Sequence, residues 1–273
     1  MNKYLAIAPK KYKYWDQLPD MWADQDRKFR DQISGKRPSQ LKREGLLSRT
    51  VDKLVANHLG RLRVHGLLES INYAIDQSIE YFHGTWWRET DQRRYLDKSL
   101  PPDERTLIWL DPMCDGMFLC ALLDSWDDVA KLAEWIDDSL SPENRFELTD
   151  DAYSVFYMYL GSKLRSVPLA REAEMPDFIR KSKSKKAKLL LPLLDAALSK
   201  SQKDFDKAMV AALKHYEKYE VEDVANFHYW VAIPHSLVWL IAQRNGLAFP
   251  TLPPNLDALI VRRETALEGL DMP

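Results

Sequence analysis

Apolar side chains recur at intervals of three and four residues along most of this chain. The clearest stripe runs from Phe205 to Tyr216, at offsets of 3, 4, 7, 8 and 11 residues. This spacing is that of one face of an α-helix, so it predicts a series of amphipathic helices. Glycine is scarce, with nine in 273 residues, whereas β-hairpin folds need it in their turns. The best strand candidate, 107–110, can equally start a helix. We therefore predict an all-α, single-domain fold.

Proline, glycine and the apolar pattern divide the chain in two. Residues 1–38 are predicted to form an irregular N-terminal arm with one short helix over Met21–Ile33, and residues 39–273 an all-α helical domain. Segment 178–188 is predicted to be a loop or a solvated helix start, and Gly246 a helix C-terminal cap. Helices of the domain are expected over 39–58, 67–82, 117–123, 125–140, 150–164, from 189 onward, and over 201–216, 222–229, 232–243 and 257–267.

Two segments, 121–133 and 197–209, follow the same plan. Each reads as a helix end, a short turn and a new amphipathic helix, and each turn carries the Ser-x-x-Asp signature of a helix start. Ser125 and Asp128 form the first signature, and Ser201 and Asp204 the second. The pair predicts helical hairpins in a partly repeat-like, tetratricopeptide-like stack. Ordinary similarity between unrelated helices is the alternative.

Charge is segregated along the sequence. Residues 97–157 hold 15 acidic and four basic side chains, a balance of −11, although the whole chain is only −2. Such a block can steer a basic partner and reject wrong ones, or it can be a solvated helix face that basic residues elsewhere balance. The basic run 180–188 lacks interleaved aromatic residues. It therefore favours a solvated loop that offsets the acidic block over a nucleic-acid site, and we expect no nucleic-acid partner.

No catalytic constellation stands out. Glu80 and His83 form one Glu-x-x-His element, but the second copy that a di-iron bundle needs is missing. His228 and His235 are expected in buried hydrogen bonds. The cluster 124–128 differs in order from Mg²⁺-binding aspartate motifs and already has a capping role. Phosphate-binding glycine loops and nucleophile elbows are absent, and neither Ser162 nor Ser236 has an activating neighbour in sequence. We expect no enzyme activity, metal or cofactor.

Cysteine content and hydropathy point to the interior of the cell. The two cysteines, Cys114 and Cys120, exclude a disulfide scaffold and fit a reducing compartment. The first nine residues have too short an apolar stretch for a signal peptide. The most apolar segment, 229–242, contains Pro234 and is shorter than a membrane span. We expect a cytoplasmic protein that does not enter a membrane.

The C-terminal third carries a resemblance. Residues 230–247 read as a late apolar helix that ends in Ala-x-x-x-Gly, Pro250, Pro253 and Pro254 follow, and Asp257–Ile260 begins a terminal helix. This order resembles the immunity-protein 49 family of bacterial polymorphic toxin systems. The similarity extends unevenly over 60–263 and rests mostly on helix boundaries. It implies a non-enzymatic, cytoplasmic antitoxin that binds a cognate toxin effector domain and blocks it.

If the toxin is a nuclease, its inhibitor must fit the basic cleft that normally binds phosphates. A protein surface rich in Asp and Glu does so. The contact residues expected on this basis are Asp124, Trp126, Asp127, Asp128, Glu134, Asp137 and Asp138. Two other functions stay open. A helical-repeat scaffold or adaptor would bind a protein or peptide in a groove lined by exposed aromatic residues. An all-α enzyme would show a deep pocket that holds His83 or His235 beside a carboxylate.

Overall fold

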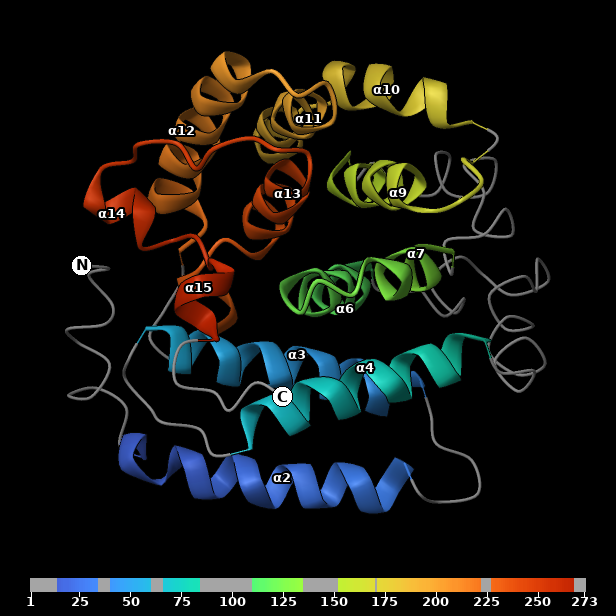
Figure 1. Cartoon of the computed structure of the whole chain (residues 1–273), viewed down its shortest axis with the longest axis vertical. Coiled ribbons are helices and arrows are strands. Elements are labelled where there is room, and N and C mark those ends of the chain that lie inside the picture. Colours follow the sequence, from blue (N-terminus) through green and yellow to red (C-terminus); the bar gives the residue numbers. More distant parts are fainter. Residues whose placement is uncertain are drawn as a thin grey trace.

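The computed structural model describes residues 14–33, 40–59, 66–83, 110–134, 152–169, 171–221 and 227–267. All regular elements in these ranges are helices, which confirms the predicted all-α, single-domain fold (Figure 1). In chain order they are η1 (Trp15–Gln17), α2 (Leu18–Ile33), α3 (Gln40–His58), α4 (Leu67–His83), α6 (Leu110–Leu122), α7 (Trp126–Glu134), α9 (Ala152–Leu164), η3 (Glu172–Glu174), α10 (Met175–Lys181), α11 (Lys185–Leu198), α12 (Gln202–Tyr219), η4 (Phe227–Trp230), α13 (Ile233–Arg244), α14 (Pro254–Asp257) and α15 (Arg263–Ala266).

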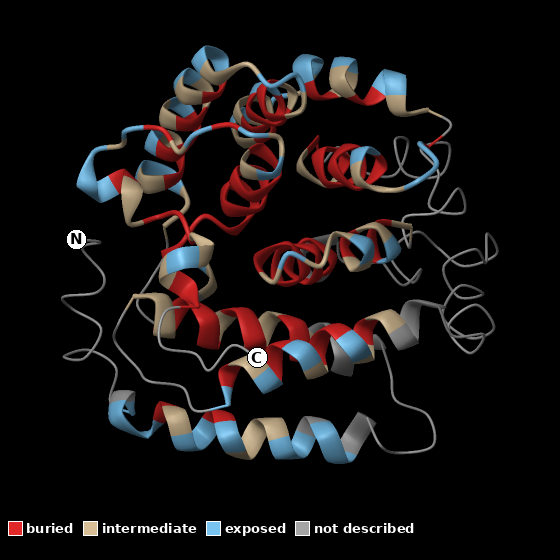
Figure 2. Ribbon diagram, viewed as in Figure 1, coloured by how far each residue is buried: buried red, intermediate tan, exposed pale blue. Residues whose placement is uncertain are grey.

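Helix α6 lies at the centre of the fold. It packs against α3, α4, α7, α9 and α13, and residues 113–122 are all buried. Gly116 makes the close approach to two neighbours possible, because a Cβ there would lie 3.1 Å from Leu132 Cδ1 and 3.5 Å from Leu47 Cδ1. Figure 2 shows α6, α9 and α13 almost wholly buried, whereas α2 and α12 present exposed faces to solvent. The core therefore runs through the middle of the molecule, and amphipathic helices surround it.

The two predicted hairpins are confirmed, and their turns match residue by residue. In the first, α6 and α7 flank Asp124, and in the second, α11 and α12 flank Lys200; both residues adopt the left-handed conformation, with φ of 64° and 59°. The next residue then donates its N–H to the carbonyl five positions earlier, at 2.9 Å in the first turn and 3.1 Å in the second. Gly246, with φ of 86°, closes α13 in the same way, as its predicted capping role requires.

The Ser-x-x-Asp signatures mark the right positions, but the second one works differently from the standard motif. Helix α7 begins just after Ser125, and α12 begins just after Ser201. The hydroxyl of Ser201 donates to the carboxylate of Asp204 at 2.7 Å and does not accept a backbone N–H. The carboxylate, placed in the first turn, also interacts favourably with the positive end of the α12 dipole.

Replacing Lys200 with glycine is expected to raise the free energy of unfolding by about 0.5–1 kcal/mol. A side chain at positive φ costs about 1–2 kcal/mol, and the greater freedom of glycine in the unfolded chain cancels part of the gain. Urea unfolding of the two proteins measures the difference. Lys207→Gly, at an exposed position inside α12, is the control and should lose about 1 kcal/mol. A loss at position 200 as well would contradict the prediction.

Several predicted boundaries need correction, and the helix expected over 117–123 already begins at Leu110. Residues 18–33 are a regular helix, not irregular arm: the helix expected over Met21–Ile33 starts three residues earlier, and its Leu18 and Trp22 are buried. The basic segment 178–188, predicted as a loop or a solvated helix start, contains a short turn and the start of α11, but its first residues belong to α10. Burial of Met175 and Ile179 holds α10 in place, and Ser184 caps α11 by accepting the N–H of Ala187 at 3.3 Å.

The predicted last helix, 257–267, is instead two short helices, α14 and α15. Between them the chain bonds to the start of α13. Leu259 O accepts from Ala232 N at 2.7 Å, and Val261 N donates to Ser236 Oγ at 3.0 Å. These bonds compete with continuation of the helix. The predicted helix 222–229 is seen only from Phe227, as the 3-10 helix η4, and residues 222–226 lie outside the described ranges.

Candidate functional site

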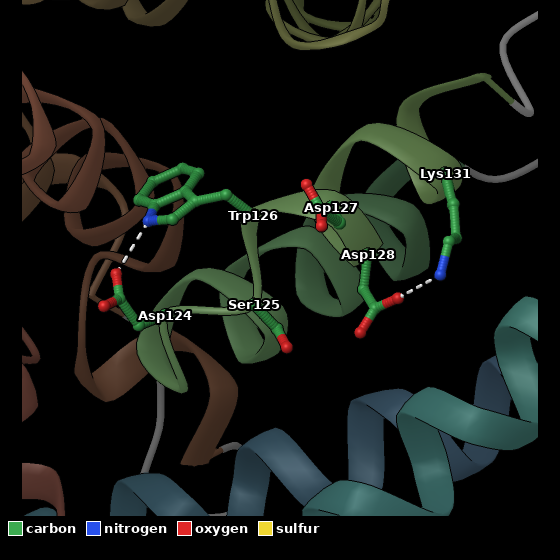
Figure 3. Close-up of a pocket in the computed structure, with 6 residues that line it drawn as sticks. All are labelled: Asp124, Ser125, Trp126, Asp127, Asp128 and Lys131. Carbon is green, nitrogen blue, oxygen red and sulfur yellow. Dashed lines mark hydrogen bonds and ion pairs between the residues drawn. The ribbon is translucent and has the colours of Figure 1, made fainter.

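The α6–α7 turn and the start of α7 carry four of the predicted contact residues: Asp124, Trp126, Asp127 and Asp128. Asp124 lies in the turn itself, 60% exposed, and Trp126 and Asp127 open α7. The positive φ at Asp124 ends α6 and turns the chain, so that Asp124, Asp127 and Asp128 lie close together in the sequence at the start of α7 but point in different directions. Together with Ser125, Trp126 and Lys131, these side chains line an open hollow of about 430 Å³ (Figure 3).

Asp124 is held in place from two sides. Its carboxylate accepts the indole N–H of Trp126 at 2.8 Å and pairs with Arg263 of α15 at 3.2 Å. The hydrogen bond from Trp126, followed by the charge of Arg263, keeps the pKa of this carboxyl below its ordinary value. Arg244, at the end of α13, lies 4.5 Å from the centre of the Trp126 ring. Trp126 is thus half-buried between α7 and the end of α13. It is not an exposed side chain that could insert into a partner.

The other two carboxylates differ in their partners. Asp128 pairs with Lys131 one turn along α7, at 2.8 Å. Asp127 is exposed, and within the described residues it makes no hydrogen bond or ion pair. Figure 3 shows the two side chains pointing in different directions from the start of the helix. Asp127 is therefore the carboxylate that is most available to a partner at this turn.

The rest of the predicted contact set is only partly visible. Glu134 is half-buried at the last described residue of α7, whereas Asp137 and Asp138 lie outside the described residues. The apolar face predicted for this helix is confirmed at Val129 and Leu132, both buried. Because Arg244, Arg263 and Lys131 contact the side chains of the turn, its surface carries mixed charge.

The basic run does not pair with the acidic block where its partners are seen. Arg180 pairs with Asp177 at 2.8 Å, and Lys186 with Glu220 at 2.7 Å. Asp177 and Glu220 both lie outside the acidic block 97–157. These two ion pairs therefore do not join the basic run to the acidic block, as the predicted charge balance would require. Lys186 also lies 3.6 Å from the centre of the Tyr153 ring, which adds a cation–π contact to its ion pair.

Tertiary packing brings together a second polar cluster, between α3, α6 and η4. Asp115 is 1% exposed, accepts the hydroxyl of Ser48 at 3.0 Å, and lies 3.5 Å from His228 Nε2. Next to it, Asp52 pairs with Arg49 at 3.2 Å, and burial raises the pKa of the Asp52 carboxyl. No sequence pattern marks this cluster, because its members are up to 180 residues apart and each stands alone in its own segment.

This arrangement can orient the imidazole of His228 and fix η4 against the two helices. The expectation that His228 enters a hydrogen-bonded environment is met in part, since the ring is 23% exposed and its partner is buried. Among the described residues, no group of three or more His, Cys, Asp or Glu side chains is placed to hold a metal ion.

Of the remaining chemical candidates, the two serines form hydrogen bonds within the fold, and His235 is buried. His235 is 2% exposed, but its Nδ1 lacks a hydrogen-bond partner, contrary to the expected buried bond. Ser162 donates to the carboxylate of Glu172 and accepts the N–H of Leu169 at 2.9 Å. Ser236 bonds to the backbone of Ala232. Cys114 and Cys120 are both buried in α6 and form no disulfide, and the side chains of Glu80 and His83 lie outside the described set.

No protein-family model, curated protein or solved structure matches this chain. The resemblance to the immunity-protein 49 family therefore rests on the sequence pattern alone. Across the described ranges, none of the helices combines the length and the apolarity that crossing a bilayer requires.

Proposed function

We propose that this chain is an immunity protein, which binds a secreted toxin domain and neutralises it without catalysis. The observation that carries the proposal is the α6–α7 turn, where exposed carboxylates project from a fixed backbone next to an open hollow. Asp124 and Asp128 are each held by a neighbouring donor, which lowers the entropy that binding would otherwise cost.

The chemistry of the turn suits a basic protein surface. A toxin that acts on nucleic acid presents lysine and arginine side chains where phosphates bind, and the unpaired carboxylate of Asp127 can take the place of a phosphate. Long-range attraction between such surfaces increases the association rate. The hollow is open to solvent and lined by charged groups, unlike the enclosed apolar pockets that hold small molecules.

Affinity purification of the tagged chain from its source cells tests the proposal directly. A stoichiometric complex with a protein that carries a C-terminal toxin domain is the expected result. Co-expression of the chain with that domain should then restore growth to cells that the domain alone arrests. Recovery of housekeeping proteins alone, or failure of the chain to protect, would reject the immunity function.

Reversing the charge of Asp127 is expected to slow binding to the purified toxin domain. Asp127→Lys removes the unpaired carboxylate and adds a repelling cation, so the association rate should fall about tenfold at low ionic strength. The difference should shrink as salt is added, because salt screens exposed charges. Stopped-flow fluorescence at several salt concentrations measures both effects.

Asp204→Lys is the matched control. Asp204 is an exposed aspartate in the first turn of α12, so its reversal has the same charge change and a similar helix-dipole cost. This variant should bind at the wild-type rate. Equal slowing by both variants would show a response to net charge alone, and would remove the α6–α7 turn as the contact surface.

A further inference from the structure

Helix α2 lies along the outer edge of the molecule (Figure 1), where it packs against α3 and makes side-chain contacts with α4. Among its described side chains, only Leu18 and Trp22 are buried, and most of the others are exposed (Figure 2). Helix α6, in contrast, is buried along its whole described length. Apolar burial supplies most of the stability of a packed helix, so the described contacts hold α2 much less firmly than α6.

Among the described side chains of α2 beyond Trp22, Asp26 and Arg30 make polar contacts to α3 and α4, and those of Phe29, Gln32 and Ile33 lie outside the described set. Lys53 of α3 is 1% exposed and forms an ion pair with Asp26. Ser70 of α4 donates to the same carboxylate at 3.2 Å, and Arg30 lies 4.3 Å from the centre of the Tyr73 ring. Both charges of a buried ion pair lose their hydration, so the pair adds little net stability. Each charge nevertheless needs the other, because a buried charge without its partner is strongly destabilising.

Several polar atoms of the same interface are left unsatisfied. Asp26 Oδ1 and the neighbouring Gln25 Oε1 are buried without a hydrogen-bond partner, and so is Oγ1 of Thr50, one turn before Lys53 on α3. Release of α2 would admit water to the two α2 atoms and to the ammonium group of Lys53. Burial also lowers the pKa of Lys53, in the direction expected for a cation that is short of water.

We propose that α2 is a releasable strap: the whole helix detaches from α3 and α4 in one step, while the rest of the protein stays folded. The surface that it uncovers is a helix-binding surface centred on Lys53 of α3, together with Ser70 of α4, which shares the Asp26 carboxylate, and Tyr73 of α4, which contacts Arg30. Its preferred occupant is α2 itself, which presents a large apolar residue, a carboxylate and a cation at successive four-residue steps: Trp22, Asp26 and Arg30. This arrangement is independent of the carboxylates of the α6–α7 turn.

Hydrogen exchange of the full-length protein, followed by mass spectrometry, tests the strap. Peptides from α2 are expected to exchange at least 100-fold faster than peptides from α6, because local release does not require global unfolding. Low concentrations of urea should accelerate exchange in α6 but barely affect α2. Equal exchange rates in the two helices, with equal urea dependence, would overturn the proposal.

A double variant tests the polar interface as the cause of release. Asp26→Leu with Lys53→Met replaces the buried ion pair by apolar side chains, and is expected to slow exchange in α2 at least tenfold with little change in α6. The control applies the same chemical change to the exposed pair Asp24 and Lys28 of α2, which are 2.6 Å apart. Unchanged exchange in α2 of the first variant, or equal slowing in the control, would contradict the assigned role.

Discussion

Acidification from pH 7 to pH 4.5 is expected to lower the free energy of unfolding by roughly 3 kcal/mol through His235 alone. Burial keeps the imidazole neutral and lowers its pKa from 6.5 to about 3. In the unfolded chain the same group takes up a proton near pH 6.5, so the unfolded state binds more protons between the two values. Stability is therefore complete above pH 6.5 and falls as the pH approaches 3, at about 1.4 kcal/mol per pH unit.

His58 adds to this loss in the same direction. Burial, helped by the nearby charge of Arg262, lowers its pKa to about 4, and its Nδ1 lies 3.1 Å from the hydroxyl of Thr265. Urea unfolding at half-unit pH intervals measures the combined slope.

Two replacements of His235 separate its protonation from its packing. His235→Phe keeps a ring next to Tyr216, whose centre is 5.3 Å from that of the imidazole, and His235→Gln keeps polarity without a charge. Both variants should flatten the pH dependence by the same amount, whatever their stabilities at pH 7. A wild-type slope in either variant would show that His235 is not the group responsible.

Replacing Phe118 with alanine is expected to lower the free energy of unfolding by about 3–5 kcal/mol. The side chain is fully buried in α6, and α6 contacts five other helices. Neighbours on several sides cannot all move to fill the space, so most of the cavity stays open. Chemical unfolding measures the loss, and mass-spectrometric hydrogen exchange should show faster exchange throughout the core.

Tyr219→Ala is the control for loss of an aromatic ring. Tyr219 is 64% exposed, and its described contacts are with His215 and Lys218 at the surface. Its removal should cost less than about 1 kcal/mol. A similar cost at both positions would mean that α6 is not the centre of the core.

Local sequence patterns predicted what local physics controls. The stripe from Phe205 to Tyr216 became the buried face of α12, and Val129 and Leu132 became that of α7. The turns after α6 and α11 were also predictable, because the Ser-x-x-Asp signature marks where the next helix begins. Prediction failed at 257–267, where distant hydrogen bonds to Ala232 and Ser236 interrupt a helix that local propensity favours.

The candidate site divides in the same way. The sequence alone determined the all-α class, most helix positions and the presence of carboxylates at the α6–α7 turn, because these depend on spacing within one segment. Only the tertiary structure decided that Arg244 covers Trp126, that Arg263 pairs with Asp124, and that Asp115 meets His228. Such contacts join residues more than 100 positions apart. They depend on how whole helices pack, and no periodicity within either segment records that information.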